Sequence, residues 1–502
     1  MKPIDLALPN EAATIRFGET LAMALRRGDM VWLRGDLGAG KPALARATIR
    51  AASGDDVLEV PSPTFTLVQT YSDLPFGTLA HADLYRISDA SEVDELGLED
   101  TRSDGVVLVE WPDKAEGLIG APSMVIDIAV EDDDSRSVVI DGDAASLERL
   151  ARSLTIRVFL DANDHIESAR SVLDADASAR SYERIRPAGS PPLILMIDPG
   201  RADGPQLQTG TGAGRPYSAT ARLAEGCSEF FGVAELLSSA DLAAPAILSA
   251  ELDAGLLLLE DLGRGTIIDD QRRPISDRYL AAAETLAAMH GQEWPRDVAL
   301  PNGSTYHLPT YDRDAMMIEV ELLSDWFLPR QRGSGMSEAE RDDFTAIWDG
   351  LFDQLSSVEK SLVLRDYHSP NIIWRDTEIG INRIGIIDFQ DALWGPAAYD
   401  VASLAQDARV DVSIELEQDI IERYCSARST VDREAFALSY AIMAAQRASK
   451  ILGIFGRLDQ RDGKPAYLAH LPRLEDYLAR SLQHPALADY RAFLRDVAKF
   501  DV

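Results

Sequence analysis

Three polar side chains in the second half of the chain have a spacing that suits phosphoryl transfer. Asp366 and Asn371 lie five positions apart, and Asp388 follows Asn371 by 17 residues, directly after the apolar run 384–387. Kinase-type transfer needs one carboxylate to accept the proton of the substrate hydroxyl, and an amide and a second carboxylate to hold Mg²⁺. We therefore predict Asp366 as the catalytic base and Asn371 and Asp388 as metal ligands. In the alternative interpretation, Asp366 and Asn371 only cap a turn and Asp388 only ends a strand, but all three would then share this spacing by coincidence.

A glycine-rich segment near the N-terminus could bind a second nucleotide. It follows the apolar run 30–33 and fits the Gly-x-x-x-x-Gly-Lys part of a P-loop, in which backbone N–H groups surround phosphate at a helix N-terminus. The predicted nucleotide-binding residues are Gly35, Gly38, Ala39, Gly40 and Lys41. Two nucleotide sites of unrelated design imply two domains.

The composition limits the class of protein. A chain of 502 residues is too long for one core, and 46% apolar residues can fill more than one. The net charge of -34 opposes binding to polyanions, so we expect no direct binding to nucleic acid. Two cysteines, no basic-then-apolar leader and no apolar run of membrane-spanning length predict a cytoplasmic protein without a membrane segment.

The order of the expected elements indicates two different folds. We expect strands at 30–34, 66–71, 78–85, 106–110, 124–129 and 137–140, and a helix at 41–52. Farther along, we expect strands at 181–186, 193–198 and 256–260, and helices at 277–289, 311–327, 338–355 and 432–457. The first set is typical of a mainly parallel α/β sheet. We predict an α/β P-loop NTPase domain at residues 1–150, followed by an α+β bilobal protein-kinase-like domain at residues 151–502.

Other segments of the second half have simpler expected roles. The run 256–263 resembles the strand and hinge between the lobes of a kinase, so Glu260 and Leu262 are predicted to bind the nucleotide. Asp400 is expected to brace the catalytic loop rather than to do chemistry. The glycine-rich run 200–214 is expected to be a surface loop.

These motifs resemble the aminoglycoside phosphotransferase and choline kinase superfamily over roughly residues 155–502. Three segments, 174–180, 319–327 and 446–458, are similar to the anomeric amino-sugar kinases, which phosphorylate N-acetylmuramate and N-acetylglucosamine in cell-wall recycling. The resemblance implies ATP and Mg²⁺ as cofactors. It also implies substrate-binding roles for residues of the last two segments: Glu321, Asp325, Arg447 and Lys450.

Two of those residues suit a particular feature of the sugar. N-acetylmuramate carries a lactyl carboxylate, and Arg447 and Lys450 lie three apart on one face of a predicted helix. Alternatively, either residue could simply face solvent on that helix or pair with neighbouring acidic residues. Met196 departs from the superfamily because it stands where a kinase normally has its phosphate-pairing Lys. Either a neighbouring arginine such as Arg184 supplies that charge, or the site works without it.

The first half resembles TsaE, the P-loop ATPase subunit of the bacterial complex that makes threonylcarbamoyladenosine in tRNA. The segments that carry the likeness are 60–68, 81–86, 96–97 and 110–112. The resemblance implies that Asp83 and Glu110 face the nucleotide as water-positioning or Mg²⁺-binding groups, and that other subunits of the complex are partners. Ordinary strand-end carboxylates are the alternative for both residues.

Pro42 breaks the P-loop pattern, because Ser or Thr should follow the lysine and ligate Mg²⁺ through its hydroxyl. Proline is tolerated in the first turn of a helix, so we expect the fold and nucleotide binding to survive and hydrolysis to suffer.

Three hypotheses follow from these motifs. The first is a bifunctional protein, with a tRNA-modification ATPase module joined to an amino-sugar kinase. The second, which Pro42 favours, makes the first half a regulatory nucleotide-binding module. The third keeps the kinase but changes its substrate to an aminoglycoside, choline or homoserine.

Overall fold

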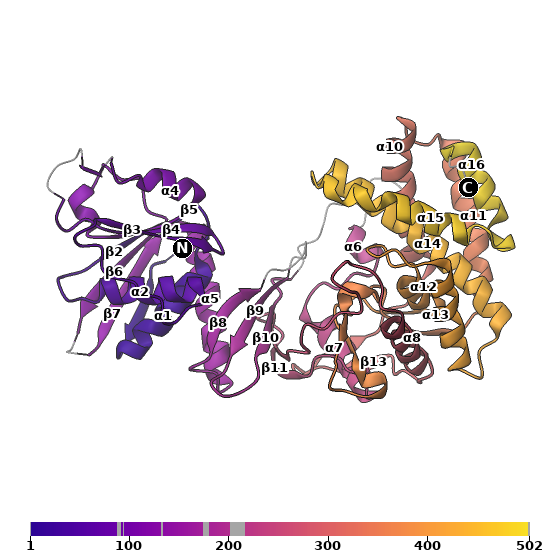
Figure 1. Cartoon of the computed structure of the whole chain (residues 1–502), viewed down its shortest axis with the longest axis horizontal. Helices are drawn as coiled ribbons and strands as arrows, with labels where there is room; N and C mark the ends of the chain where they lie inside the picture. The colour runs from indigo at the N-terminus through magenta and orange to yellow at the C-terminus, as the bar shows by residue number, and fades with distance from the viewer. Residues whose placement is uncertain are drawn as a thin grey trace. The chain divides into compact units, whose positions relative to one another are not determined.

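A computed structural model describes residues 2–87, 92–93, 95–131, 134–173, 180–200 and 216–499. The chain divides into two compact units, Met1–Ile197 and Asp198–Val502. Figure 1 shows the first unit as a sheet with helices and the second as mainly helical. The glycine-rich run 201–214 and the segment 174–179 lie outside the described residues.

The first unit is built on a seven-stranded mixed sheet with the order β1-β7-β6-β2-β5-β4-β3. The strands are β1 (Ile4–Leu8), β2 (Met30–Arg34), β3 (Val68–Leu74), β4 (Gly77–Asp83), β5 (Gly105–Glu110), β6 (Met124–Val130) and β7 (Arg136–Gly142). The pairs β2–β5, β2–β6 and β4–β5 are parallel, and the other three pairs are antiparallel. The prediction of a mainly parallel sheet was therefore too strong, because the strands at both edges pair antiparallel.

Helices α1 (Glu11–Ala24) and α2 (Lys41–Ser53) pack side by side and share a core with the sheet. The shorter helix α4 (Leu98–Asp104) and the 3₁₀ turn η1 (Pro112–Ala115) complete the NTPase fold. Helix α2 starts at the end of the P-loop, where Pro42 occupies its first turn. Gly35 has φ +137°, and a Cβ there would lie 2.3 Å from the Ile128 carbonyl oxygen, so only glycine fits.

Helix α5 (Ala144–Ala162) spans the predicted boundary at residues 150 and 151. It packs on α1, and side-chain bonds tie it to α1 and to Asp29, which directly precedes β2. Arg149 binds both carboxylate oxygens of Asp29 at 2.8 Å, Ser153 Oγ donates to Thr20 O at 2.8 Å, and Arg157 pairs with Glu19 at 2.9 Å. The segment that joins the two predicted domains is thus an anchored helix.

Three further strands of the first unit follow α5 and form an antiparallel meander: β8 (Ala169–Leu173), β9 (Ser181–Arg186) and β10 (Leu193–Ile197). Strand β8 contacts both α1 and α2. Arg170 on β8 forms a bidentate ion pair with Glu183 at 2.8 and 2.9 Å and also donates to Ser153 O on α5 at 3.2 Å. The helix that follows the P-loop therefore packs against the first strand of the predicted kinase domain.

The second unit contains the hairpin β11 (Ile247–Glu251) and β12 (Leu256–Glu260), followed by helices around small two-stranded sheets. The longer helices are α7 (Cys227–Ser239), α8 (Ser276–His290), α9 (Arg313–Leu322), α11 (Glu338–Gln354), α12 (Ala398–Ala405), α13 (Ile414–Ser426), α14 (Arg433–Gln460), α15 (Leu471–Ser481) and α16 (Ala488–Ala498). The short strands are β13 (Asp297–Ala299), β14 (Thr305–His307), β15 (Lys360–Val363), β16 (Ile372–Trp374), β17 (Ile384–Ile386) and β18 (Leu393–Pro396). Short helices are α6 (Tyr217–Thr220) and α10 (Leu328–Arg332).

Helix α14 approaches α9 and the π-helical turn after it, Leu323–Phe327, very closely. A Cβ at Gly453 would lie 2.2 Å from the Leu322 carbonyl carbon, and one at Gly456 would lie 3.1 Å from the Trp326 carbonyl oxygen. The two glycines therefore let α14 rest on the backbone of the segment 319–327. The expected helix 311–327 begins at Arg313, and its last turn, Leu323–Phe327, is π-helical, a feature common at functional sites.

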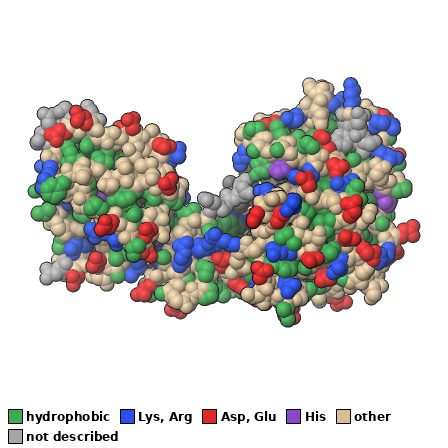
Figure 2. Space-filling model, viewed as in Figure 1, with side chains coloured by type: hydrophobic (Ala, Val, Ile, Leu, Met, Phe, Trp, Pro, Cys, Tyr) green, Lys and Arg blue, Asp and Glu red, His purple; other side chains and the backbone are tan. Residues whose placement is uncertain are grey.

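The surface mixes charges of both signs. Figure 2 shows acidic and basic side chains interspersed over much of the face in view. Among the residues that the structure describes, no helix is long and apolar enough to cross a membrane.

We predict that Arg170→Met lowers the free energy of unfolding of the full chain by about 3–5 kcal/mol, because Glu183 would be left buried without its partner. Urea denaturation measures this. Adding Glu183→Leu should recover most of the loss, since no charge would then stay buried. Arg27→Met is the control, because the Arg27–Asp104 pair is exposed and its loss should cost under ~1 kcal/mol. Equal losses in the two single variants would contradict the prediction.

Candidate functional site

The structure brings the three predicted kinase residues together in the second unit. Asp366 lies in the loop after β15, Asn371 ends that loop, and Asp388 follows β17, which pairs with β16. Asn371 Nδ2 donates to the Asp366 carbonyl at 2.9 Å and lies 3.3 Å from Asp388 Oδ2. Asp388 is exposed and has φ +59°, so its strained backbone turns the carboxylate toward Asn371.

Two buried carboxylates hold the backbone of this loop. Asp400 on α12 accepts hydrogen bonds from Leu364 N at 2.7 Å and Arg365 N at 3.0 Å. Asp407 accepts one from Ser369 N at 2.8 Å. Both carboxylates are fully buried, and they fix the loop on both sides of Asp366. The expected bracing role of Asp400 agrees with these contacts.

Cations surround the predicted base. Burial alone would raise the pKa of Asp366, but the charges of Lys450, His368, Arg365 and Arg447 together lower it. Asp366 is therefore ionised at neutral pH and able to accept a hydrogen bond from a hydroxyl.

Glu319 on α9 is the centre of a buried group that we call the Glu319 cluster. Its Oε1 binds Lys450 Nζ at 2.8 Å and the guanidinium of Arg365. Its Oε2 accepts from the Tyr311 hydroxyl and from Gln446 Nε2, the latter at 2.9 Å. The cluster joins α9, α14 and the catalytic loop. Lys450, predicted to bind sugar, is thus brought next to the loop that carries Asp366.

The other predicted substrate-binding residues lie around the same helices. Glu321 is buried on α9, and Arg447 is buried on α14, where its Nη1 donates to Gln406 O at 3.2 Å. Asp325 is exposed in the π-helical turn and pairs with Arg341 at 3.0 Å. Their contact with a sugar stays a prediction.

The predicted hinge residues lie at the end of β12 in the second unit, where Glu260 is the last strand residue and Leu262 follows. Glu260 is half-buried, and its backbone N–H donates to Ala246 O at 2.9 Å, while Leu262 is half-buried. In the first unit, Met196 on β10 is fully buried, and no charge occupies that position. Arg184 pairs in register with Ile194, two positions from Met196 on the same strand face.

The P-loop of the first unit has its lysine in place. Lys41 Nζ donates to the carbonyls of Gly35 at 2.6 Å and Asp36 at 3.0 Å and lies 3.7 Å from the centre of the Trp111 ring. Burial lowers the pKa of Lys41, although the charges of Glu110 and Asp83 oppose this. Ala39 is buried, and its carbonyl accepts from Arg136 at 3.0 Å. Gly38 and Gly40 have positive φ, as the turn requires.

Asp83 and Glu110 are direct neighbours at the ends of the parallel strands β4 and β5. Asp83 accepts from Thr64 Oγ1 at 2.7 Å and from Tyr85 N at 3.0 Å, and Glu110 binds His81 Nε2 at 2.8 Å. Both carboxylates are buried. The structure therefore gathers Lys41, Asp83 and Glu110, as the sequence predicted, and adds Thr64 and His81.

Metal binding would need oxygen atoms from outside the protein. No group of three or more His, Cys, Asp or Glu residues in the described parts of the chain is arranged to hold a metal ion. Asn371 and Asp388 fit the hard-oxygen preference of Mg²⁺, which usually takes one or two protein ligands and completes its shell with phosphates and water.

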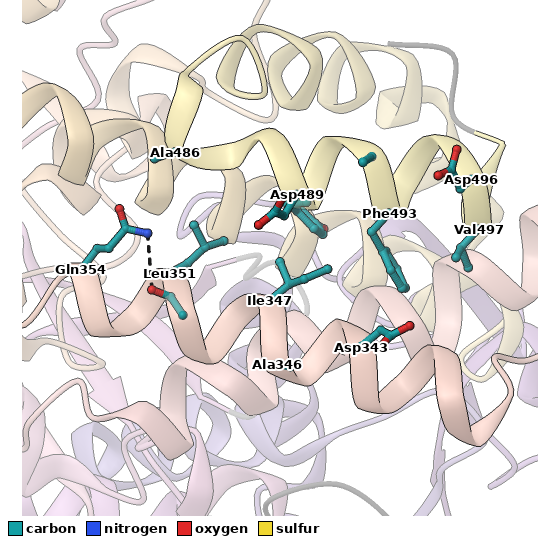
Figure 3. A pocket seen from close by; sticks show the side chains of 13 residues that line it. Asp343, Ala346, Ile347, Leu351, Gln354, Ala486, Asp489, Phe493, Asp496 and Val497 are labelled. Atoms are coloured by element: carbon teal, nitrogen blue, oxygen red, sulfur yellow. Dashed lines mark hydrogen bonds between the residues drawn. The ribbon is translucent and has the colours of Figure 1, made fainter.

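A separate groove lies between α11 and α16 (Figure 3). Its volume is about 610 Å³, and Ile347, Leu351 and Phe493 form its apolar floor. Asp343, Asp489 and Asp496 line it, and it includes no Lys or Arg. An acidic groove does not suit a phosphate, and it contains none of the predicted site residues.

Sequence reasoning missed the residues that act over long separations. Glu319, Tyr311 and Gln446 were not predicted to support the loop, and neither was Asp407. Glu319 and Lys450 are far apart in the chain, and no local pattern pairs them. His81 could have been found, because it alternates with Asp83 on one strand.

Both family models that match the chain agree with these two sites. Residues 8–138 match the threonylcarbamoyl adenosine biosynthesis protein TsaE, and residues 170–437 match the phosphotransferase enzyme family. Helix α5 lies between the two matches. The compact first unit therefore includes the TsaE match and the first strands of the phosphotransferase match.

Curated relatives cover each half over most of their own length. An N-acetylmuramate/N-acetylglucosamine kinase of Caulobacter vibrioides is 36% identical over 342 residues, which are 67% of this chain and 93% of the relative. One of Pseudomonas putida is 31% identical over 322 residues, 63% of this chain and 84% of the relative. A tRNA threonylcarbamoyladenosine biosynthesis protein TsaE of Rickettsia felis is 36% identical over 144 residues, 28% of this chain and 83% of the relative.

The fold and the family matches define an ATP-dependent kinase that follows a P-loop NTPase domain. The chain belongs to the phosphotransferase enzyme family through its second half and to the TsaE family through its first half.

We predict that Asp366→Asn lowers kcat by about 10²–10⁴-fold while ATP still binds, because the carboxylate serves the hydroxyl and not the nucleotide. A coupled assay and nucleotide titration measure the two effects. Asp342→Asn, at an exposed position of α11, is the control and should leave both unchanged. Near-normal turnover of Asp366→Asn would show that another group is the base.

For the P-loop, we predict that Pro42→Thr raises ATP hydrolysis and its dependence on Mg²⁺, because the threonine supplies the missing hydroxyl ligand. The assay is done in an Asp366→Asn background, which silences the kinase half. Pro42→Ala relieves the proline without adding a hydroxyl and serves as the control. If alanine and threonine have the same effect, or if neither raises hydrolysis, the inference from Pro42 is wrong.

Proposed function

We propose that the second half of the chain phosphorylates the anomeric hydroxyl of N-acetylmuramate and N-acetylglucosamine, with ATP as donor and Mg²⁺ as its metal. The observation that carries the proposal is the arrangement of Asp366, Asn371 and Asp388, in a chain that covers 93% of a relative named for those two sugars.

Each residue has a distinct part in the proposed reaction. Asp366 orients the hydroxyl and accepts its proton while the phosphoryl group moves. Asn371 and Asp388 would hold Mg²⁺, which supplies positive charge to the phosphates. Asp400 and Asp407 keep the loop in one conformation, so that these groups need little rearrangement during the reaction.

The substrate contacts are assigned by position. Glu321, Asp325 and Arg447 lie on α9, the π-helical turn and α14, which contact each other next to the catalytic loop. Arg447 remains the candidate for the lactyl carboxylate of N-acetylmuramate, since a buried guanidinium binds a carboxylate strongly. Glu260 and Leu262 are the proposed adenine contacts.

For the first half, we propose nucleotide binding in the service of tRNA threonylcarbamoyladenosine formation, with subunits of that modification complex as partners. Lys41, Asp83 and Glu110 support nucleotide binding. Pro42 and the bonds from Lys41 to its own loop favour slow hydrolysis, so a regulatory module is the second candidate.

The direct test offers purified full-length protein a panel of acceptors with ATP and Mg²⁺. The panel contains N-acetylmuramate, N-acetylglucosamine, an aminoglycoside, choline and homoserine, and ³¹P NMR locates the phosphate. We predict phosphate at the anomeric oxygen of both amino sugars, and no product from Asp366→Asn. Phosphorylation of the amines alone, or of a different sugar hydroxyl, would contradict the proposal.

A further inference from the structure

His81 is a buried polar side chain on the helix-covered face of the sheet in the first unit. It alternates on β4 with Leu79 and Asp83, so these three side chains share one face. On β5, Leu108 lies directly opposite His81, and Glu110 lies opposite Asp83. Leu79 and Leu108 belong to the core that the sheet shares with α1 and α2. His81 therefore lies on the side of the sheet that carries the helix after the P-loop.

Burial makes this histidine costly. Its side chain is 1% exposed, and in the described part of the chain its Nδ1 has no hydrogen-bond partner. A leucine would bury apolar surface at this position and leave no polar atom unpaired. The other ring nitrogen, Nε2, lies 2.8 Å from Oε1 of Glu110. The polarity of the ring is therefore used in its bond to Glu110.

This bond determines how the Glu110 carboxylate is presented. A carboxylate oxygen accepts hydrogen bonds, so Nε2 of His81 carries the proton and donates to Oε1. Among the residues that the structure describes, none donates to the other oxygen, Oε2. Asp83 differs, because Tyr85 N donates to its Oδ1 and Thr64 Oγ1 donates to its Oδ2. Of the two carboxylates, Glu110 is thus the one that keeps an oxygen for a ligand.

Glu110 ends β5 beside the P-loop. The Lys41 ammonium lies 3.7 Å from the centre of the Trp111 ring, and Trp111 directly follows Glu110. In a P-loop, the lysine and the loop amides surround the phosphates, and the metal ion bridges two of them. Pro42 has no hydroxyl to bind that ion, so a carboxylate oxygen nearby becomes its main candidate ligand from the protein.

We propose that His81 is a positioning residue for the nucleotide site of the first half, and that its Nε2–H holds one oxygen of Glu110 so that Oε2 is free to bind the Mg²⁺ of the nucleotide. The ring does not touch the nucleotide and acts through Glu110. The inference rests on the proposed nucleotide binding of the first half, and it assigns the metal to Glu110 rather than to Asp83.

The test compares two amide replacements of His81 that differ in reach. The amide nitrogen of glutamine lies close to where the ring has Nε2, and that of asparagine lies close to where the ring has Nδ1. His81→Gln should therefore keep a donor to Glu110, whereas His81→Asn should lose it. Both are made in the full chain with Asp388→Ala, which removes a predicted metal ligand of the second half.

Calorimetric titration with ATP, in the presence and absence of Mg²⁺, measures binding, and the binding lost in Lys41→Ala is assigned to the P-loop. We expect His81→Asn to weaken Mg²⁺-dependent ATP binding at that site about 10-fold, as when a group that orients a metal ligand is removed. Binding without Mg²⁺ should stay unchanged, because Lys41 and the loop amides remain. His81→Gln should keep most of the Mg²⁺-dependent affinity. His307→Phe, at an exposed pair with Asp297, is the control and should change neither affinity.

A role in packing alone makes a different prediction. His81→Leu fills the core without a polar atom, so it should bind ATP and Mg²⁺ like the unaltered protein if the ring only packs. Positioning predicts instead that His81→Leu behaves like His81→Asn. If His81→Leu does not fold, the comparison of glutamine with asparagine decides, and equal Mg²⁺-dependent affinities in those two variants would overturn the inference.

Two further outcomes separate the inference from the function on which it rests. If Lys41→Ala leaves all ATP binding unchanged, the first half has no nucleotide site, and the proposed function fails together with the role of His81. If the site binds ATP but Mg²⁺ does not strengthen the binding, nucleotide binding stands, whereas Glu110 holds no metal and the inference is wrong.

Discussion

The catalytic half of this protein depends on buried carboxylates that bind the backbone of one loop. Asp400 and Asp407 together accept three backbone N–H groups on the two sides of Asp366. A loop rich in polar groups would otherwise sample many conformations, and an ordered one costs conformational entropy. Buried charge-assisted hydrogen bonds offset that cost and leave Asp366, Asn371 and Asp388 in one arrangement. The Glu319 cluster adds a second fixed point, through the side chain of Arg365.

The same kind of interaction joins the two halves of the chain. An ion pair and a hydrogen bond of α5 anchor it to α1, and Arg170 on β8 donates to Ser153 O on α5. A sequence-level description as two domains with a boundary near residue 150 therefore differs from the packing, in which residues 1–197 form one unit. Helix α2, which follows the P-loop, is in contact with β8.

The sequence predicted what depends on local pattern. The Asp366, Asn371 and Asp388 spacing, the P-loop, and the strands that carry Asp83 and Glu110 all follow from short motifs, and the structure gathers the residues of each. The strand directions were missed although the pattern differs between them: the parallel strand β5 is buried throughout, whereas the antiparallel strand β1 alternates between exposed and more buried residues. Helix α5 was not predicted because it spans the boundary between the two predicted domains, and its apolar face could be assigned to the core of either one.

Long-range pairings were also invisible in the sequence. Lys450 was predicted to bind a carboxylate of the sugar, whereas in the structure its Nζ binds the carboxylate of Glu319. Both glutamates of α9 lie in the same sequence motif, and which of them meets the lysine depends on how α14 packs against α9. The lowering of the pKa of Asp366 by the charge of Lys450 could likewise not be predicted, because the two residues are distant in the chain.

The most direct test of the central claim is a crystal structure of the full chain with ADP, Mg²⁺ and N-acetylmuramate or N-acetylglucosamine. The account predicts that the anomeric oxygen lies roughly 2.6–3.2 Å from a carboxylate oxygen of Asp366. It also predicts that Asn371 and Asp388 contact the metal. A sugar that turns its anomeric oxygen away from Asp366, or that binds with another hydroxyl at this carboxylate, would contradict it.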